Sequence, residues 1–245
     1  MISHLQSSFA MKCKRADIRL RSDSIGYGVS EVDMHCVQGV WKNLRDEGKL
    51  PQFEGTILNA LDFVVSDEGV TIECGLMLYR CLVARSYQNL PSIKPVAVSG
   101  FVEKKRATGD GAVLLGRRSA GSSTHSGWYE TPPSGGLEVA DVNSDGSIDI
   151  TKRLAIELFE ETRIERTAVE SWNMFGVYYD DPTGTIDIIV RLGVNDSALR
   201  VIPTSEYSEL RWAMPSEILA LTERADVRVV DVSRWILNQW LDEQA

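Results

Sequence analysis

Three glutamates in one short segment are the residues of this sequence best placed to do chemistry together. Glu157, Glu160 and Glu161 follow the spacing i, i+3 and i+4, which on a helix puts their carboxylates on one face. Like charges at this spacing repel, so a helix gains from the arrangement only when a cation lies between them. Mg²⁺ prefers hard oxygen ligands and usually shares them with a substrate phosphate. The segment therefore indicates a magnesium site.

A glycine pair upstream, Gly135-Gly136, gives this reading its support. Glycine lets the backbone approach a ligand closely, because it has no Cβ. An acidic helix face alone is more often a solvated surface than a metal site. The glycine pair and the Trp128 segment before it favour the metal site over the solvated surface.

Composition excludes several classes of function. The net charge of −9 argues against a nucleic-acid polymer as partner, because such binding needs a basic face, although a local Lys/Arg cluster can still bind a small phosphate compound. No apolar run approaches the roughly 18 residues of a membrane span. The four cysteines lack metal-ligand spacing and are typical of reduced thiols. These features predict a cytoplasmic protein without a membrane segment.

The first part of the chain, residues 1–93, is predicted to be an α+β extension. A helix is expected from Ser30 to Leu44, with Ser30 as its N-cap and apolar residues at helical spacing. Two strands, 57–65 and 70–77, follow around a hairpin-like turn. A third element is expected at 78–84.

The second part, residues 94–245, has a more regular pattern. A hairpin, a Gly/Ser loop, a helix, two strands, a short strand and two helices follow one another, which predicts an α/β/α sandwich with a mixed sheet. Ser233 is expected to cap the last helix. The expected elements are strands 96–103, 113–117, 128–130, 175–179, 186–194 and 209–212, a charged turn at 104–111, a helix at about 151–162, and helices opened by Pro215 and Ser233.

The stretch from Pro95 to about Leu221 resembles the Nudix hydrolase family. The family's box reads Gly-x5-Glu-x7-Arg-Glu-U-x-Glu-Glu-x-Gly-U, where U is aliphatic. Gly136 matches its opening glycine, residues 157–162 match Glu-U-x-Glu-Glu-x, and Ile164 matches the final aliphatic position. The resemblance implies a Nudix-type fold.

Three positions depart from the family's box. Ile156 stands where the family has an arginine that orients the carboxylates, and Arg153, one helical turn before Glu157, is a candidate to replace it. Arg163 stands in place of the closing glycine. The spacing from Gly136 to Glu157 is longer than in the family, and the middle glutamate has no clear counterpart.

The resemblance implies that a diphosphate lies across Mg²⁺ ions, with Mn²⁺ as the alternative, while water attacks one phosphorus. It makes Glu157, Glu160 and Glu161 metal ligands, together with the carbonyl of Gly136 or of Gly135. Glu160, Glu161 and Glu206 are the expected catalytic residues. The family does not fix the general base, so Glu161 and Glu206 both stay open.

Substrate contacts are expected from arginines and a tyrosine near these carboxylates. Arg117 or Arg118 is expected to pair with a phosphate, and only one of them, because neighbouring strand residues face opposite ways. Tyr178 or Tyr179 is expected to stack on a base. The candidate substrate-binding residues are Arg117, Arg118, Gly135, Gly136 and Tyr179.

The upstream helix with Trp41 and the strands before the core resemble the Nudix subgroup that acts on nucleoside-diphosphate sugars. This implies a nucleotide sugar as the small-molecule substrate. Another Nudix substrate, ADP-ribose or a dinucleotide, stays open, and so does a catalytically silent fold that binds nucleotides. Dimers are common in the family, which leaves a homodimer open.

A rival signal lies between residues 141 and 152. Asp141, Asn143, Asp145 and Gly146 match a calcium loop of the EF-hand type, but Lys152 stands where a bidentate carboxylate belongs. We therefore interpret the segment as an inserted hairpin turn or loop, with a weak calcium site as the alternative.

Overall fold

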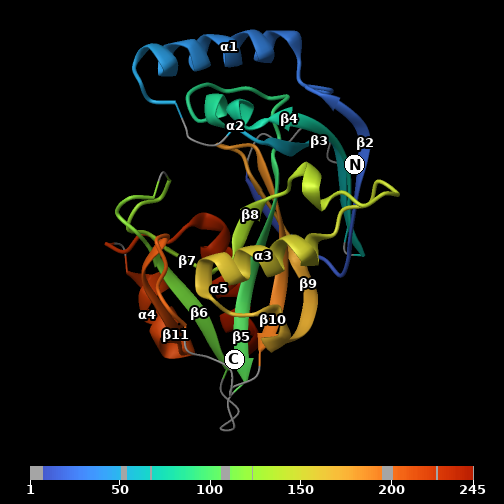
Figure 1. Cartoon of the computed structure of the whole chain (residues 1–245). Coiled ribbons are helices and arrows are strands. Elements are labelled where there is room, and N and C mark those ends of the chain that lie inside the picture. Colours follow the sequence, from blue (N-terminus) through green and yellow to red (C-terminus); the bar gives the residue numbers. More distant parts are fainter. Residues whose placement is uncertain are drawn as a thin grey trace. The chain divides into compact units, whose positions relative to one another are not determined.

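Two sheets organise the computed structural model of the chain (Figure 1). The large sheet has the strand order β1-β9-β10-β5-β6-β11, with β7 paired to β6 and β8 paired to β5, and the small sheet has the order β2-β4-β3. The structure describes residues 8–50, 54–66, 68–105, 111–122, 124–194, 201–224 and 226–244. The expected α/β class, with a large sheet and several helices, is confirmed. Within the described ranges, no helix has the length and apolar character that a bilayer crossing needs.

The chain forms two compact units that are not separated by a single cut. Unit 1 is Met1–Val98, Gly136–Ile150 and Gly176–Ile188, and unit 2 is Ser99–Gly135, Thr151–Phe175 and Ile189–Ala245. The division of the chain into an N-terminal extension, residues 1–93, and a second part, residues 94–245, stays a prediction.

Unit 1 contains the small sheet and two helices. β4 pairs in parallel with β2 and antiparallel with β3, and the β3–β4 hairpin confirms the two strands expected there. The third expected element is a short helix, α2. The elements are β1 (Phe9–Lys12), β2 (Ala16–Ile25), α1 (Glu31–Asp46), β3 (Thr56–Ser66), β4 (Gly69–Leu78), α2 (Tyr79–Arg85) and the 3-10 helix η1 (Val139–Asp141).

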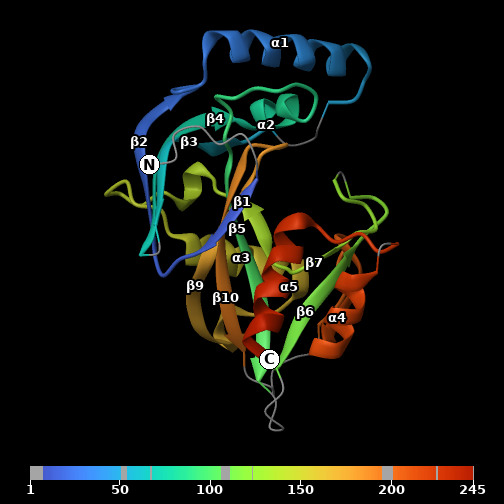
Figure 2. The same ribbon diagram turned by 180° about the vertical axis from the view of Figure 1, so that it is seen from behind.

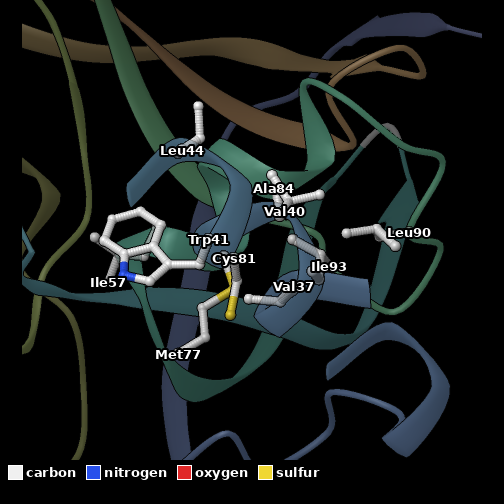
Figure 3. Packing of buried hydrophobic residues seen from close by; sticks show 10 residues of the cluster. All are labelled: Val37, Val40, Trp41, Leu44, Ile57, Met77, Cys81, Ala84, Leu90 and Ile93. Atoms are coloured by element: carbon white, nitrogen blue, oxygen red, sulfur yellow. The ribbon is translucent and has the colours of Figure 1, made fainter. Parts of the chain in front are cut away.

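The apolar face of α1 forms the core of unit 1 (Figure 3). Ser30 caps the helix, since its side chain accepts a hydrogen bond from the Asp33 N–H at 3.1 Å. The i, i+3, i+4 and i+7 positions of α1 then face α2 and the sheet. The buried cluster consists of Val37, Val40, Trp41, Leu44, Ile57, Met77, Cys81, Ala84, Leu90 and Ile93.

Unit 2 carries a hairpin, its partner strand and three helices, of which α4 and α5 lie side by side (Figure 2). β6 pairs antiparallel with β5, β7 and β11, so three short sequence patterns meet on one strand. Among the described elements, four strands have residues in both units: β5 (Val96–Lys105), β8 (Ser134–Gly136), β9 (Val169–Asp180) and β10 (Thr185–Val194). Helix α3 (Ile150–Thr162) has its first residue in unit 1 and the rest in unit 2. The other elements are β6 (Gly111–Arg118), β7 (Tyr129–Glu130), the 3-10 helix η2 (Arg166–Ala168), β11 (Tyr207–Ala213), α4 (Pro215–Glu223) and α5 (Asp231–Gln244).

The expected helix cap at Ser233 is wrong, and an expected strand of unit 2 has different bounds in the structure. The last helix begins at Asp231, so Ser233 lies inside it and is not the cap. Its hydroxyl, 2% exposed, instead accepts a hydrogen bond from the Thr131 N–H at 3.0 Å, a tertiary contact that sequence spacing does not show. β9 is longer than the expected strand 175–179. Of the expected turn at 104–111, residues 106–110 lie outside the described residues.

Candidate functional site: a carboxylate cluster on α3

Helix α3 presents the three glutamates at different depths. Leu154 and Leu158 are fully buried and anchor one side of the helix in unit 2. Glu161 is 2% exposed, Glu157 is half-buried and Glu160 is exposed. The helix therefore holds one carboxylate in the interior and offers another to solvent within a single turn.

Glu161 sits in a network of neutral donors. The Ser134 N–H donates to its Oε1 at 3.1 Å, and the Tyr207 hydroxyl donates to its Oε2 at 2.9 Å. The same hydroxyl lies 2.7 Å from Glu130 Oε1, and Arg118 Nη1 donates to that oxygen at 2.6 Å. Because a phenol has one proton, Tyr207 can donate to only one carboxylate at a time.

The two buried carboxylates of this network differ in whether a cation pairs with them. Arg118 stabilises the charge on Glu130, whereas no cation pairs with Glu161 among the described residues. Burial raises the pKa of Glu161 well above its ordinary value, and the charges of Glu130 and Glu206 raise it further. Of the two buried carboxylates, Glu161 is therefore the one whose charged form is left without a cation among the described residues.

Glu157 is the second carboxylate of the cluster whose pKa is raised. Burial raises its pKa to about 7, and the charges of Glu160 and Glu206 add to the rise, while Arg153 lowers it. Arg153 Nη1 lies 3.4 Å from Glu157 Oε1, so the contact one helical turn apart that could replace the family's arginine is present. Ile156 itself is 39% exposed.

Gly135 lies directly against the Glu157 side chain. A Cβ at Gly135 would stand 2.2 Å from Glu157 Oε1, closer than any real contact, so Glu157 keeps this position only beside a glycine. At Gly136, which ends β8, a Cβ would meet nothing within 4 Å. The structure thus gives the two glycines different surroundings, and their roles toward metal and substrate stay predictions.

The loop before β11 also contacts α3. The Thr204 hydroxyl donates to the Glu161 carbonyl oxygen at 3.1 Å, and the Glu206 N–H donates to the Thr204 hydroxyl at 3.3 Å. The exposed Glu206 carboxylate is near enough to raise the pKa of both Glu157 and Glu161. The structure therefore brings Glu206 to the cluster, and its role as general base stays a prediction.

The two candidate arginines point to different partners, as strand alternation requires. Arg118 donates to Glu130 and to the Thr124 carbonyl oxygen at 3.0 Å. Arg117 lies over the Tyr129 ring, 5.8 Å from its centre, and donates to the Gly127 carbonyl oxygen at 3.3 Å. Neither contact tests a role in phosphate binding.

Tyr179, the candidate for stacking on a base, belongs to unit 1. It is 5% exposed, and its ring lies 6.0 Å from that of Phe9 and 6.2 Å from that of Phe63. This packing accounts for the burial of the ring by apolar contact. The stacking role of Tyr179 stays a prediction.

The calcium-like segment forms the expected hairpin turn, in which Val142 and Ile148 form an antiparallel bridge. Gly146 turns the chain with φ +81°. The Asp145 carboxylate accepts both the N–H and the hydroxyl of Ser147, at 3.0 and 2.6 Å. Internal hydrogen bonds thus engage a side chain that the calcium interpretation would use as a ligand.

Donor chemistry decides whether the α3 cluster fits a metal. Among the described residues, no three His, Cys, Asp or Glu side chains are grouped as a formed ligand set. The charges of Glu160 and Glu206 nevertheless raise the pKa of Glu157, those of Glu130 and Glu206 raise the pKa of Glu161, and a divalent cation would offset both effects. Their oxygens are the ligands that Mg²⁺ and Mn²⁺ prefer. The residues therefore fit such an ion chemically, after side-chain adjustment.

Glu130 and Tyr207 are missing from the residues that the sequence singles out. Both lie in segments that the pattern predicts as strands or strand edges, Trp128 to Glu130 and the stretch before Glu209. A polar residue at an inward position of a strand is the signal that could have identified Glu130. The pairing of β6 with β7 and β11, which brings the two together, has no local signature.

Comparisons with known proteins give similarity at the level of solved structures alone. No protein-family profile and no curated protein matches the sequence. A MutT protein from Methanosarcina mazei Go1 is 21% identical over 62% of this chain and 96% of its own, with a TM-score of 0.40. An Ap4A hydrolase from C. elegans is 16% identical over 61% and 97%, with a TM-score of 0.42. A NUDIX hydrolase from Alicyclobacillus acidocaldarius is 14% identical over 61% and 91%, with a TM-score of 0.49. We draw neither fold nor activity from similarities of this size.

Proposed function

We propose that this chain is a Nudix-type hydrolase that cleaves the diphosphate linkage of a nucleoside diphosphate joined to another moiety, with Mg²⁺ or Mn²⁺ as cofactor. One observation carries the proposal: Glu161 is buried without a cation, in a chain segment that also presents Glu157 and Glu160. A buried acid is costly unless it is paired or binds a metal. Arg118 forms its ion pair with Glu130, so Glu161 is the buried acid that is available to bind a metal ion.

The chain's own groups divide the work. Glu157, Glu160 and Glu161 would hold the ion, with the Gly136 carbonyl as a further ligand, and the ion would neutralise charge that develops on the diphosphate. Tyr207 and the Ser134 N–H orient Glu161. Glu206 is exposed and close to the cluster, which suits a group that takes a proton from water.

The substrate is proposed to be a nucleotide sugar, on the likeness of the N-terminal part to the subgroup that acts on such compounds. ADP-ribose and dinucleotides are the enzymatic alternatives. Ile156 in place of the box arginine keeps a third alternative open, a catalytically silent fold that binds nucleotides without turnover. We place the activity in the cytoplasm, because the described cysteines are free thiols.

A panel of nucleotide sugars, ADP-ribose and dinucleotides tests the proposal, with Mg²⁺ present and phosphate release measured after coupling to a phosphatase. We expect turnover of at least one nucleotide sugar, and its loss in Glu160→Gln. Glu165→Gln, at an exposed acid three positions after the end of α3, is the matched control and should keep the wild-type rate.

The results separate the readings. Nucleotide binding without turnover on every member of the panel would replace the enzymatic proposal by the silent fold. Full activity in both Glu160→Gln and Glu161→Gln would contradict the assignment of the metal site to α3.

A further inference from the structure

A cavity of about 500 Å³ opens within unit 1, and none of its lining residues is assigned above to catalysis. Its volume falls in the range of roughly 300 to 1,000 Å³ that is typical of small-molecule sites. Two of its lining residues are cations, one is an aromatic residue, and none is acidic. The lining residues are Arg21, Tyr27, Gly28, Ala60, Leu61, Ser92 and Lys94.

One wall is fixed by a buried amide. The Asn59 side chain, 0% exposed, donates to the Ser92 carbonyl oxygen at 3.1 Å and accepts from the Lys94 N–H at 2.7 Å. The Ala60 N–H in turn donates to the Lys94 carbonyl oxygen at 2.8 Å. The backbone that carries Lys94 is therefore set before any ligand arrives, which lowers the entropic cost of binding.

A buried carboxylate holds the same wall from the helix side. Asp33 Oδ2 accepts the N–H of Ser92 at 2.8 Å and its hydroxyl at 2.5 Å, while the Ser30 N–H donates to the Ser92 hydroxyl at 2.9 Å. Asp33 is 4% exposed. Asp33 Oδ2 is thus hydrogen-bonded to Ser92, and Asp33 is not among the residues that line the cavity.

The opposite wall is a turn that keeps a tyrosine exposed. The Gly26 N–H donates to the Leu76 carbonyl oxygen at 2.6 Å, which ties the turn to β4. Gly28 has φ +82°, and a Cβ there would stand 2.0 Å from a methyl carbon of Leu61, so this wall requires glycine. Between them Tyr27 is 45% exposed, a large ring held at the surface by a fixed backbone.

The charges of the cavity favour an anion. Arg21 pairs with Glu73 at 2.9 Å, but both side chains are about half exposed, and such surface pairs contribute little free energy. One bond to Glu73 leaves further guanidinium N–H groups for a ligand. Lys94 has no ion pair among the described residues. In a chain of net charge −9, two cationic side chains at one cavity make that cavity locally favourable for an anionic ligand.

We propose that this cavity binds an anionic small molecule that combines a phosphate with a planar ring, of nucleoside monophosphate size. Lys94 and Arg21 contact the phosphate, and the ring stacks on Tyr27. None of the residues that line the cavity belongs to the carboxylate cluster, and the site needs no metal. Its occupant binds as an effector does and is not the substrate of the proposed hydrolysis.

Calorimetric titration of the full chain with UMP and AMP in the presence of EDTA tests this site without the metal cluster. We expect Lys94→Ala to weaken binding about tenfold, through loss of a charge-assisted hydrogen bond. Tyr27→Ala should weaken it about fivefold, through loss of stacking. Lys42→Ala and Tyr87→Ala remove an exposed lysine and an exposed tyrosine of the same unit that do not line the cavity, and they should bind like wild type.

Thermal melting followed by circular dichroism confirms that each variant is folded, and Lys94→Glu, which should abolish binding, replaces any variant that is not. Inorganic phosphate should bind more weakly than UMP, and phosphate binding of equal strength would overturn the contact with the ring. The Glu160→Gln/Glu161→Gln double variant should bind UMP unchanged, which separates this site from the hydrolytic proposal. Absence of UMP and AMP binding at millimolar concentration, or equal losses in the control variants, would overturn the site.

Discussion

Two buried glutamates of unit 2, Glu103 and Glu161, have opposite surroundings. Glu103, 7% exposed, accepts from Arg191 Nε at 2.7 Å and from the indole N–H of Trp240 at 3.1 Å. Arg191 also donates to Glu243 at 2.7 Å. Glu161 receives only neutral donors, and further acids raise its pKa. A buried acid with its own cation stabilises the fold, whereas one without a cation is a candidate for binding an ion.

The largest expected effect separates the two acids by function. Glu161→Gln should lower turnover about 100-fold or more, because a metal ligand is lost, while the melting temperature stays near wild type because a neutral amide avoids the burial cost that raises the pKa of Glu161. Glu103→Gln should keep the wild-type rate and lower the melting temperature. Steady-state rates and thermal melts of both variants check this, and a reversed pattern would contradict the comparison.

Removing the cation of the structural pair should give the next largest effect. Arg191→Met leaves Glu103 with the indole N–H alone and should lower the free energy of unfolding by about 2 kcal/mol. Arg211→Met is the matched control, since Arg211 also joins two glutamates, Glu209 and Glu217, but at a more exposed position, and it should cost under about 1 kcal/mol. Urea unfolding measures both, and equal losses would argue against the structural role of Glu103.

Tyr207 is expected to position Glu161 and not to touch the substrate. Tyr207→Phe removes the hydroxyl shared by Glu130 and Glu161, and should lower kcat about tenfold and raise the Mg²⁺ concentration at half-maximal rate, with KM for substrate unchanged. Tyr87→Phe, at an exposed tyrosine, is the control. A change confined to KM would instead indicate a substrate contact.

The smallest effect concerns the packing of Gly135 on Glu157. In Gly135→Ala the new methyl group meets the end of a flexible side chain, so the fold should tolerate it while Glu157 is displaced. We expect about a fivefold loss of rate with little change in melting temperature. Gly121→Ala, where a Cβ meets nothing within 4 Å, should change neither quantity. A stability loss without a rate loss would remove Glu157 from the site.

Local patterns predicted much of the fold because the forces that they report are local. The helical spacing of Val37, Val40, Trp41 and Leu44 and the Ser30 cap specify α1, and the alternation around the β3–β4 turn specifies that hairpin. Ser233 shows where local reasoning ends. A serine near a helix start is an ordinary cap, but α5 begins at Asp231, and the Ser233 hydroxyl accepts from the distant Thr131 N–H.

The sequence by itself determined that Glu157, Glu160 and Glu161 share one face of α3, because helix geometry fixes the i, i+3 and i+4 positions. Tertiary structure decided which of them lacks a cation. Strand pairing with β6 brings Arg118, Glu130 and Tyr207 together. Arg118 forms its ion pair with Glu130, so Glu161 is buried beside neutral donors. Pairing between distant strands depends on packing across the whole sheet, and no short segment encodes it.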